Sequence, residues 1–156
     1  MKIIIELFSD YKDLNFQTLF LAYFQEIGVF LPEGYNVFDD IALSAINEKM
    51  MTLVAKDSDQ MVAFLMFQPE TFTSSSNFFK QSTIFIREFS VKLSHRKHGI
   101  GKQLMESIFD YAKANAYHSV VLTTTTAKNF YLSLGFVEDN SYQAKNKQPV
   151  FIKHIE

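Results

Sequence analysis

The chain has 156 residues and a mass of 18.0 kDa, which suits one ordinary domain. Its 15 lysine and arginine residues against 17 aspartate and glutamate residues give a net charge of −2, so the molecule as a whole offers no positive field that would attract nucleic acid. It contains no cysteine, which excludes disulfides, cysteine–zinc sites and a cysteine nucleophile.

The apolar runs of the chain are short. Glu6 ends the N-terminal run well before the length of a signal-peptide core, and the run Met61–Phe67 is too short to cross a bilayer. We therefore expect a single cytoplasmic domain over residues 1–156, with no membrane partner and no nucleic-acid partner.

A strand followed by two helices is expected first. The isoleucine-rich segment Lys2–Leu7 predicts the strand. Apolar residues then recur at helical spacing over Leu14–Ile27, and Gly28 follows as a natural helix end. A second helical pattern, Phe38–Ile46, begins beside two aspartates whose charge suits a helix N-terminus.

Strands and one long helix are expected in the middle of the chain. Met50–Ala55 and Met61–Phe67 flank the polar connector Lys56–Gln60, which predicts a hairpin. The next strand is expected within Phe79–Leu93, and a helix over Gly99–Ala116.

The C-terminal part predicts one more short helix between strands. Ser119–Thr125 is rich in β-branched residues and indicates a buried strand. Ala127–Leu134 predicts a short helix that Gly135 ends. Phe136–Val137 and Val150–Ile155 would complete the sheet, so the fold class is α/β.

The segment Phe89–Lys102 joins a strand to a helix through a basic turn that contains glycine. A helix N-terminus presents unpaired backbone N–H groups, and glycine lets an anionic ligand approach them closely. Arg96, Lys97 and Lys102 add positive charge at the same place. The sequence therefore predicts an anion site here.

Two common phosphate motifs do not fit this segment. A Walker loop would need glycine where Arg96 stands and serine or threonine where Gln103 stands. A dinucleotide fingerprint needs three glycines, whereas only Gly99 and Gly101 are present.

The pattern Arg-x-x-Gly-x-Gly at Arg96–Gly101 resembles the coenzyme A pyrophosphate loop of the GNAT superfamily of N-acetyltransferases. A second segment, Ala127–Phe136, is similar to the family pattern A-x-x-[FL]-Y-x-x-x-G-F, and one helix and one strand are expected between the two motifs, as in the family. The resemblance implies the GNAT fold: a mixed, mostly antiparallel sheet with one splayed parallel pair, flanked by helices.

The resemblance implies acetyl-CoA as co-substrate. Its pantetheine arm would lie between the splayed strands and its diphosphate on the loop. One departure from the family pattern is Thr124, where many members carry asparagine, with Asn129 as a nearby substitute. The residues that the resemblance assigns to coenzyme binding are Phe89, Val91, Arg96, Lys97, His98, Gly99, Ile100, Gly101, Lys102, Thr124, Asn129 and Tyr131.

The resemblance also implies two catalytic residues. Tyr131 matches the tyrosine that donates a proton to the departing thiolate, and a phenol is neutral at pH 7 as this role requires. Glu88, on the strand before the loop, is the candidate general base. The alternatives are a tyrosine that only packs its helix onto the sheet and a glutamate that only faces solvent.

The histidines and serines near the loop are candidate metal ligands and candidate nucleophiles. His95 and His98 have no conventionally spaced third ligand, so we expect no metal and regard both as phosphate-side donors or solvated residues. Ser90 and Ser94 have no nearby histidine and acid in a recognisable nucleophile arrangement.

The expected function is transfer of an acetyl group from acetyl-CoA to a primary amine by direct attack in a ternary complex. Several acidic residues near the expected acceptor wall favour a small cationic amine and equally suit a solvated helix start: Glu26, Glu33, Asp39 and Asp40. The alternatives are a non-catalytic acyl-CoA-binding regulatory module and a protein N-terminal or lysine acetyltransferase. Dimers are common in the family, so a homodimer is compatible with the resemblance.

Overall fold

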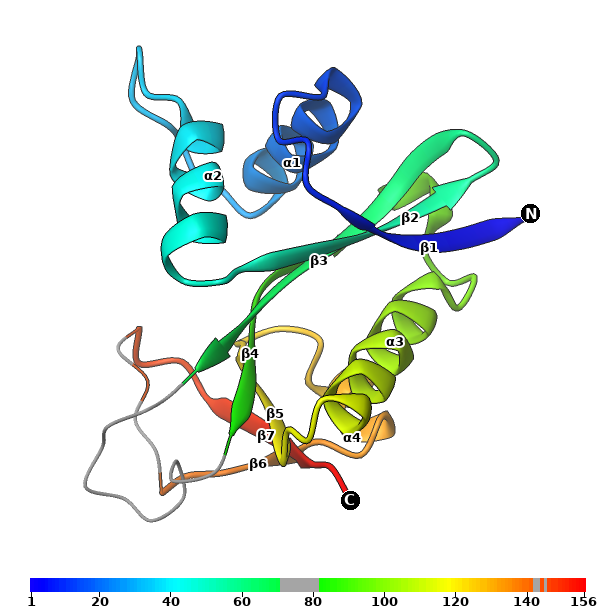
Figure 1. Cartoon of the computed structure of the whole chain (residues 1–156), viewed down its shortest axis with the longest axis vertical. Coiled ribbons are helices and arrows are strands. Elements are labelled where there is room, and N and C mark those ends of the chain that lie inside the picture. Colours follow the sequence, from blue (N-terminus) through cyan, green and yellow to red (C-terminus); the bar gives the residue numbers. More distant parts are fainter. Residues whose placement is uncertain (71–81, 142–143, 145) are drawn as a thin grey trace. The chain divides into compact units, whose positions relative to one another are not determined.

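The computed structural model describes residues 1–70, 82–141, 144 and 146–156. Figure 1 shows the helices and strands of the chain. The chain divides into two compact units. Unit 1 consists of Met1–Phe67 and Glu88–Leu104, and unit 2 of Gln68–Arg87 and Met105–Glu156. The expectation of a single domain over residues 1–156 stays a prediction.

The strands of unit 1 form an antiparallel ladder. β1 (Ile3–Phe8) pairs with β2 (Met51–Asp57), which pairs with β3 (Gln60–Glu70). The connector between β2 and β3 is shorter than predicted, because Lys56 and Asp57 continue the ladder. The Lys56 ammonium lies 2.6 Å from a carboxylate oxygen of Glu6 on β1, so this polar residue is accommodated inside a strand.

The two helices of unit 1 begin at side-chain caps. α1 (Leu14–Glu26) follows Asp13, whose carboxylate accepts a hydrogen bond from the Phe16 amide at 2.9 Å. α2 (Val37–Asn47) follows Asn36, whose side chain accepts from the Phe38 amide at 2.9 Å. The aspartates that were predicted to start this helix, Asp39 and Asp40, lie in its first turn. Both helices therefore lie where the periodicity placed them.

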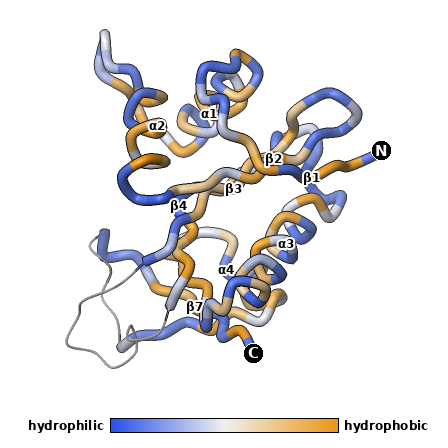
Figure 2. The backbone as a smooth tube through the Cα atoms, in the orientation of Figure 1, coloured by the Kyte–Doolittle hydropathy of each residue, from blue (hydrophilic) through white to orange (hydrophobic). Residues whose placement is uncertain are grey.

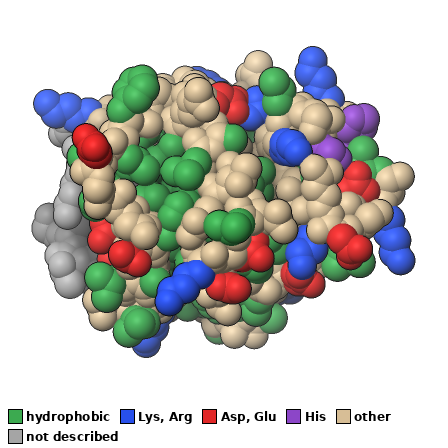
Figure 3. Space-filling view, turned by 90° about the horizontal axis from the view of Figure 1, so that it is seen from above, with side chains coloured by type: hydrophobic (Ala, Val, Ile, Leu, Met, Phe, Trp, Pro, Cys, Tyr) green, Lys and Arg blue, Asp and Glu red, His purple; other side chains and the backbone are tan. Residues whose placement is uncertain are grey.

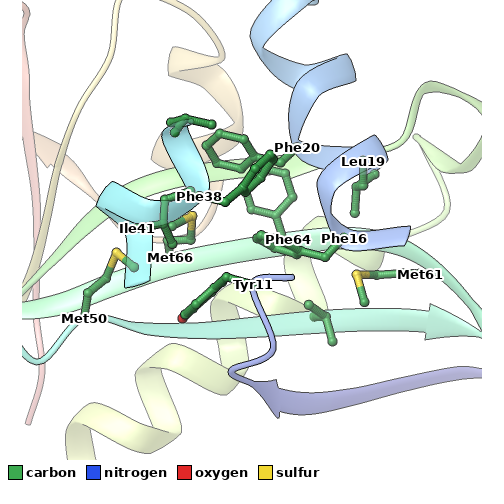
Figure 4. Packing of buried hydrophobic residues seen from close by; sticks show 12 residues of the cluster. Tyr11, Phe16, Leu19, Phe20, Phe38, Ile41, Met50, Met61, Phe64 and Met66 are labelled. Carbon is green, nitrogen blue, oxygen red and sulfur yellow. The ribbon is translucent and has the colours of Figure 1, made fainter. Parts of the chain in front are cut away.

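An aromatic core holds α1 and α2 on the strands of unit 1. Phe16 and Phe20 of α1 are buried against Phe64 of β3, with ring centroids 6.0 and 5.4 Å apart (Figure 4). Phe38 of α2 adds a fourth ring, 5.7 Å from Phe20. The buried members of this core are Tyr11, Phe16, Leu19, Phe20, Val37, Phe38, Ile41, Met50, Val54, Met61, Phe64 and Met66.

Unit 2 carries the parallel strand pair. β4 (Thr83–Val91) runs parallel to β5 (Ser119–Thr123), and β7 (Val150–His154) lies antiparallel between β5 and β6 (Val137–Glu138). The short helix α4 (Lys128–Ser133) connects β5 to β6. β5 ends two residues earlier than predicted, because the Thr124 side chain and the Thr126 amide form a local turn, with N to Oγ1 3.0 Å.

The segment predicted as a strand over Phe79–Leu93 needs a partial correction. Residues 79–81 lie outside the described residues, and β4 ends at Val91. It ends there because Leu93–His95 forms a 3-10 turn, with the His95 amide 2.8 Å from the Lys92 carbonyl. α3 (Ile100–Ala114) follows this turn, and hydrophobic and hydrophilic residues alternate along it (Figure 2).

Across the described residues the strand order is β1-β2-β3-β4-β5-β7-β6. The sheet is mixed and mostly antiparallel with one parallel pair, and helices α1 to α4 flank it, as predicted. None of the helices in the described part of the chain is long and apolar enough to span a membrane.

Candidate active site

The loop between η2 (Leu93–His95) and α3 has the backbone of an anion site. Lys97 and Gly99 have positive φ angles of 66° and 79°. The first helical hydrogen bond of α3 runs from the Gln103 amide to the Gly99 carbonyl at 3.0 Å, so the amides of Ile100 and Gly101 precede it and have no carbonyl acceptor within the helix. A Cβ atom at Gly99 would meet no heavy atom within 4 Å, so the space beside this residue is open.

The side chain of Arg96 binds protein groups in this structure. Its Nε donates to the Val91 carbonyl at 2.8 Å, and its Nη2 donates to Glu26 Oε2 on α1 at 2.6 Å. The hydrogen bond from Arg96 holds the pKa of Glu26 below its usual range. Arg96 therefore fastens the loop to the end of β4 and to α1, and the exposed charge beside the loop comes from Lys97 and Lys102.

His98 and His95 lie in different surroundings. His98 is exposed in the loop. His95 is not a solvated residue: its Nε2 lies 3.0 Å from Asp57 Oδ2 on β2, and its Nδ1 lies 2.8 Å from Ser94 Oγ. A serine, a histidine and an aspartate are thus hydrogen-bonded in series, contrary to the expectation for Ser94. This series of hydrogen bonds connects the 3-10 turn to the end of β2.

Glu88 lies on β4 and is half-buried. Its Oε2 accepts a hydrogen bond from the hydroxyl of Tyr23 on α1. The carboxylate of the predicted base is therefore held by a partner on another element. The helical spacing over Leu14–Ile27 does not single out Tyr23. The signal that could have identified it is its hydroxyl, because the other residues at this spacing are aromatic or aliphatic without a polar atom: Phe16, Leu19, Phe20, Phe24 and Ile27.

The parallel ladder of unit 2 is short. It pairs Thr83–Phe85 with Ser119–Val121 and ends there, although β5 continues to Thr123 and β4 to Val91. The predicted parallel strand pair is confirmed. Phe89 and Val91 lie in the later part of β4 and are half-buried.

Tyr131 lies in α4 among aromatic rings of unit 2. The ring centroids of Phe130 and Phe136 are 5.2 and 5.7 Å from its own, both edge-on. Only 9% of Tyr131 is exposed, and this burial raises its pKa to about 12. The phenol is therefore neutral at every pH at which an enzyme ordinarily works.

Thr124 and Asn129 differ in what their side chains do. The hydroxyl of Thr124 donates to the Thr126 carbonyl at 2.6 Å, and it also accepts from the amide of that residue. Asn129 is exposed at the start of α4. Among the described residues there is no group of three histidine, aspartate or glutamate side chains arranged to hold a metal ion.

Residues 5–136 match the acetyltransferase (GNAT) family. The chain belongs to this family. A rat relative, N-acetyltransferase 8F1, is 33% identical over 101 residues, which are 62% of this chain and 44% of the relative. The chain spans less than half the length of the curated relatives it matches.

Solved structures of family members share the fold. A predicted acetyltransferase with acetyl-CoA from Clostridium acetobutylicum aligns with a TM-score of 0.72 and 13% identity, over 92% of this chain and 95% of that one. The NatC complex bound to Gag peptide and CoA contains a chain that aligns with a TM-score of 0.65 and 19% identity, over 100% of both chains. These likenesses concern the fold alone.

Proposed function

We propose that this protein transfers an acetyl group from acetyl-CoA to a primary amine by direct attack within a ternary complex. The observation that carries the proposal is the loop before α3, where the amides of Ile100 and Gly101 precede the first helical hydrogen bond and the space beside Gly99 is open. Membership of the GNAT family supports the same reaction. Acetyl-CoA supplies the activated acyl group, and the residues of the chain hold both substrates and handle the protons.

The coenzyme is held mainly by main-chain groups in this proposal. The Arg96 amide donates to the Leu93 carbonyl at 3.4 Å, so amides from Lys97 to Lys102 bind the diphosphate. The exposed side chains of Lys97 and Lys102 add positive charge, and that of His98 adds a polar contact. Main-chain groups of Phe89 and Val91 bind the amides of the pantetheine arm in this proposal, as the resemblance to the family implies. Since the Thr124 hydroxyl already serves a local turn, Asn129 is the better pantetheine contact of the two.

Acetyl-CoA should stabilise the folded protein. At a roughly 100- to 1,000-fold excess over its dissociation constant, the free energy of unfolding should rise by about 3 to 4 kcal/mol, because the ligand binds only the folded chain. Thermal unfolding with and without acetyl-CoA measures this, and pantetheine, which lacks the diphosphate, is the matched ligand and should stabilise less. An unchanged melting temperature with acetyl-CoA would contradict the coenzyme assignment.

Glu88 is the general base in this proposal. Its place on β4 before the loop and its hydrogen bond from Tyr23 support this role. The attacking amine must lose a proton, directly or through a water molecule, and a half-buried carboxylate can accept it.

Glu88→Gln should flatten the rise of rate with increasing pH. At neutral pH the rate should fall roughly tenfold, less than general base catalysis commonly contributes, because part of the amine also loses its proton in solution. The measurement is kcat/KM from pH 6 to 9. Glu6→Gln is the control, since it removes an exposed carboxylate on β1. An unaltered pH profile in Glu88→Gln would exclude Glu88 as the base.

The acceptor in this proposal is a small cationic amine. The acidic residues of unit 1 support it, although two of them have protein partners: Glu26 binds Arg96, and Asp40 accepts from the Tyr35 hydroxyl. Glu33 and Asp39 are exposed. Seen from the side of α1 and α2, hydrophobic side chains gather on the surface with acidic side chains around them (Figure 3).

A peptide amine is the second candidate, and an apolar groove favours it. The groove has a volume of about 300 Å³ and is lined by Leu21, Phe24, Gln25, Val29, Phe30 and Leu31. Phe30 is 90% exposed there. A panel of polyamines, amino acids, aminoglycosides and short peptides, assayed by release of the coenzyme A thiol, separates the two candidates. Coenzyme binding without turnover on any amine would instead indicate a regulatory acyl-CoA-binding module.

A further inference from the structure

We infer that Tyr23 is a positioning residue that holds the carboxylate of Glu88 ready to act as the base. This inference rests on the proposed function, in which Glu88 takes the proton of the attacking amine. It concerns a residue of α1 that lies 65 positions from Glu88 in the chain.

The contact between the two residues lies within unit 1. The Tyr23 hydroxyl donates to Glu88 Oε2, and both side chains are half-buried. Because Tyr23 comes from α1 and Glu88 from β4, the bond joins a helix to the strand that leads into the coenzyme loop. A hydrogen-bond donor that is fixed on a neighbouring element restricts the rotamers of the Glu88 side chain. A hydrogen bond from a water molecule would leave the side chain free to change rotamer.

The ring of Tyr23 is itself held by aromatic neighbours. The centroids of Phe20, Phe24 and Phe64 lie 6.1, 5.8 and 5.5 Å from that of Tyr23. Phe20 and Phe64 belong to the buried aromatic core (Figure 4). The hydroxyl therefore cannot swing away from Glu88 unless these ring contacts are also broken, and its position is fixed by the same packing that fixes α1.

A hydroxyl that donates to a carboxylate favours the charged form of that carboxylate. Tyr23 therefore keeps Glu88 ionised, and able to accept a proton, at a lower pH than it would be without this donor. The other ionisable residues on α1, α2 and β4 are Glu26, Asp39, Asp40 and Arg87. Glu26 is paired with Arg96, and Arg87 donates to Gln68 Oε1 at 2.9 Å. None of these four is altered when only the Tyr23 hydroxyl is removed.

Tyr23→Phe should move the rise of kcat/KM with pH upward by about one pH unit, because a hydrogen bond to a charged group is worth roughly one to two units. The rate on the high-pH plateau should stay within about twofold, since Glu88 remains in place. Tyr35→Phe is the matched control: it also removes a tyrosine hydroxyl that donates to a carboxylate, that of Asp40, on the exposed surface. The control should leave the profile unchanged.

Two further measurements make the test independent of turnover. Carbon-13 titration of the glutamate side chains, with the Glu88 signal assigned by its loss in Glu88→Gln, should show the same upward displacement in Tyr23→Phe. Replacement of Tyr23 by 3-fluorotyrosine keeps the ring and strengthens the hydrogen-bond donor, so the Glu88 titration should move to lower pH than in the wild-type protein.

The outcomes separate this inference from the proposed function. If Glu88→Gln flattens the pH profile while Tyr23→Phe leaves both the profile and the Glu88 titration in place, the inference is wrong and the base role stands. If Glu88→Gln itself leaves the profile unchanged, the base role is wrong. A loss of melting temperature in Tyr23→Phe without any displacement of the titration would mean that Tyr23 only packs, and would also overturn the inference.

Discussion

Replacing Tyr131 with phenylalanine should lower the turnover number about 100-fold and leave the dissociation constant of coenzyme A unchanged, because it removes one proton donor and little else. The side chain is 9% exposed, and its burial raises the pKa of Tyr131 to about 12. The phenol therefore stays protonated across the working range, and the substitution removes a neutral hydroxyl rather than a charge.

The high pKa also decides what kind of donor Tyr131 is. A free thiol has a pKa of about 8.5, so complete proton transfer from a phenol with a pKa of about 12 is uphill by roughly 3.5 units. The hydroxyl contributes most as a hydrogen-bond donor to the sulfur while negative charge develops on it. We accordingly expect no decline of rate from ionisation of Tyr131 below about pH 11.

A second buried tyrosine supplies the control for this experiment. The Tyr11 hydroxyl is hydrogen-bonded to Thr52 Oγ1 at 3.0 Å in the core of unit 1. Tyr11→Phe should lower the free energy of unfolding by about 1 kcal/mol, because the buried threonine loses its partner, and should leave turnover unchanged. The measurements for Tyr131→Phe are single-turnover kinetics and equilibrium binding of coenzyme A. Wild-type turnover in this variant, or a coenzyme affinity that falls as much as turnover, would show that Tyr131 is not the donor.

Much of the fold could be predicted from the sequence because the signals are local. The helical spacing around Phe16 and Phe20 and the glycine that follows it are enough to place α1. The predicted bounds are wrong at the ends of strands, where contacts that the local residue pattern does not report determine the last residue. Lys56 stays in β2 because its backbone pairs with β1 and β3, and its side chain lies beside Glu6. Thr124 ends β5 by binding the backbone of Thr126.

The candidate site divides in the same way. The coenzyme loop is a contiguous segment, so its glycines and its helix start could be read from residue spacing alone. The contacts that hold its neighbours are not contiguous: Tyr23 meets Glu88 across 65 positions, and Glu26 meets Arg96 across 70. Sequence periodicity reports which face of a helix is apolar, but it does not report which distant polar group that face meets.

Replacing Gly99 with glutamate should weaken binding of coenzyme A on the order of 100-fold. A carboxylate about 5 Å from a diphosphate charge costs roughly 3 kcal/mol at an effective dielectric constant of about 20. A new side chain meets no heavy atom within 4 Å of its Cβ, so the loss of affinity would come from charge and not from displaced neighbours. The φ angle of 79° adds strain of about 1 to 2 kcal/mol to the folded chain.

Gly34 separates these two effects, because its φ angle is also 79° and its Cβ position is equally open. Gly34→Glu and Gly99→Glu should lose similar stability in chemical unfolding, whereas only Gly99→Glu should lose coenzyme affinity in calorimetric titration. Gly99→Ala, which adds strain and one methyl group without charge, should lose less coenzyme affinity than Gly99→Glu. Added salt should reduce the difference in coenzyme affinity between Gly34→Glu and Gly99→Glu, since it screens exposed charges. Equal coenzyme affinity in both would show that the diphosphate binds elsewhere, and the main-chain amides before α3 would then lose their assigned role.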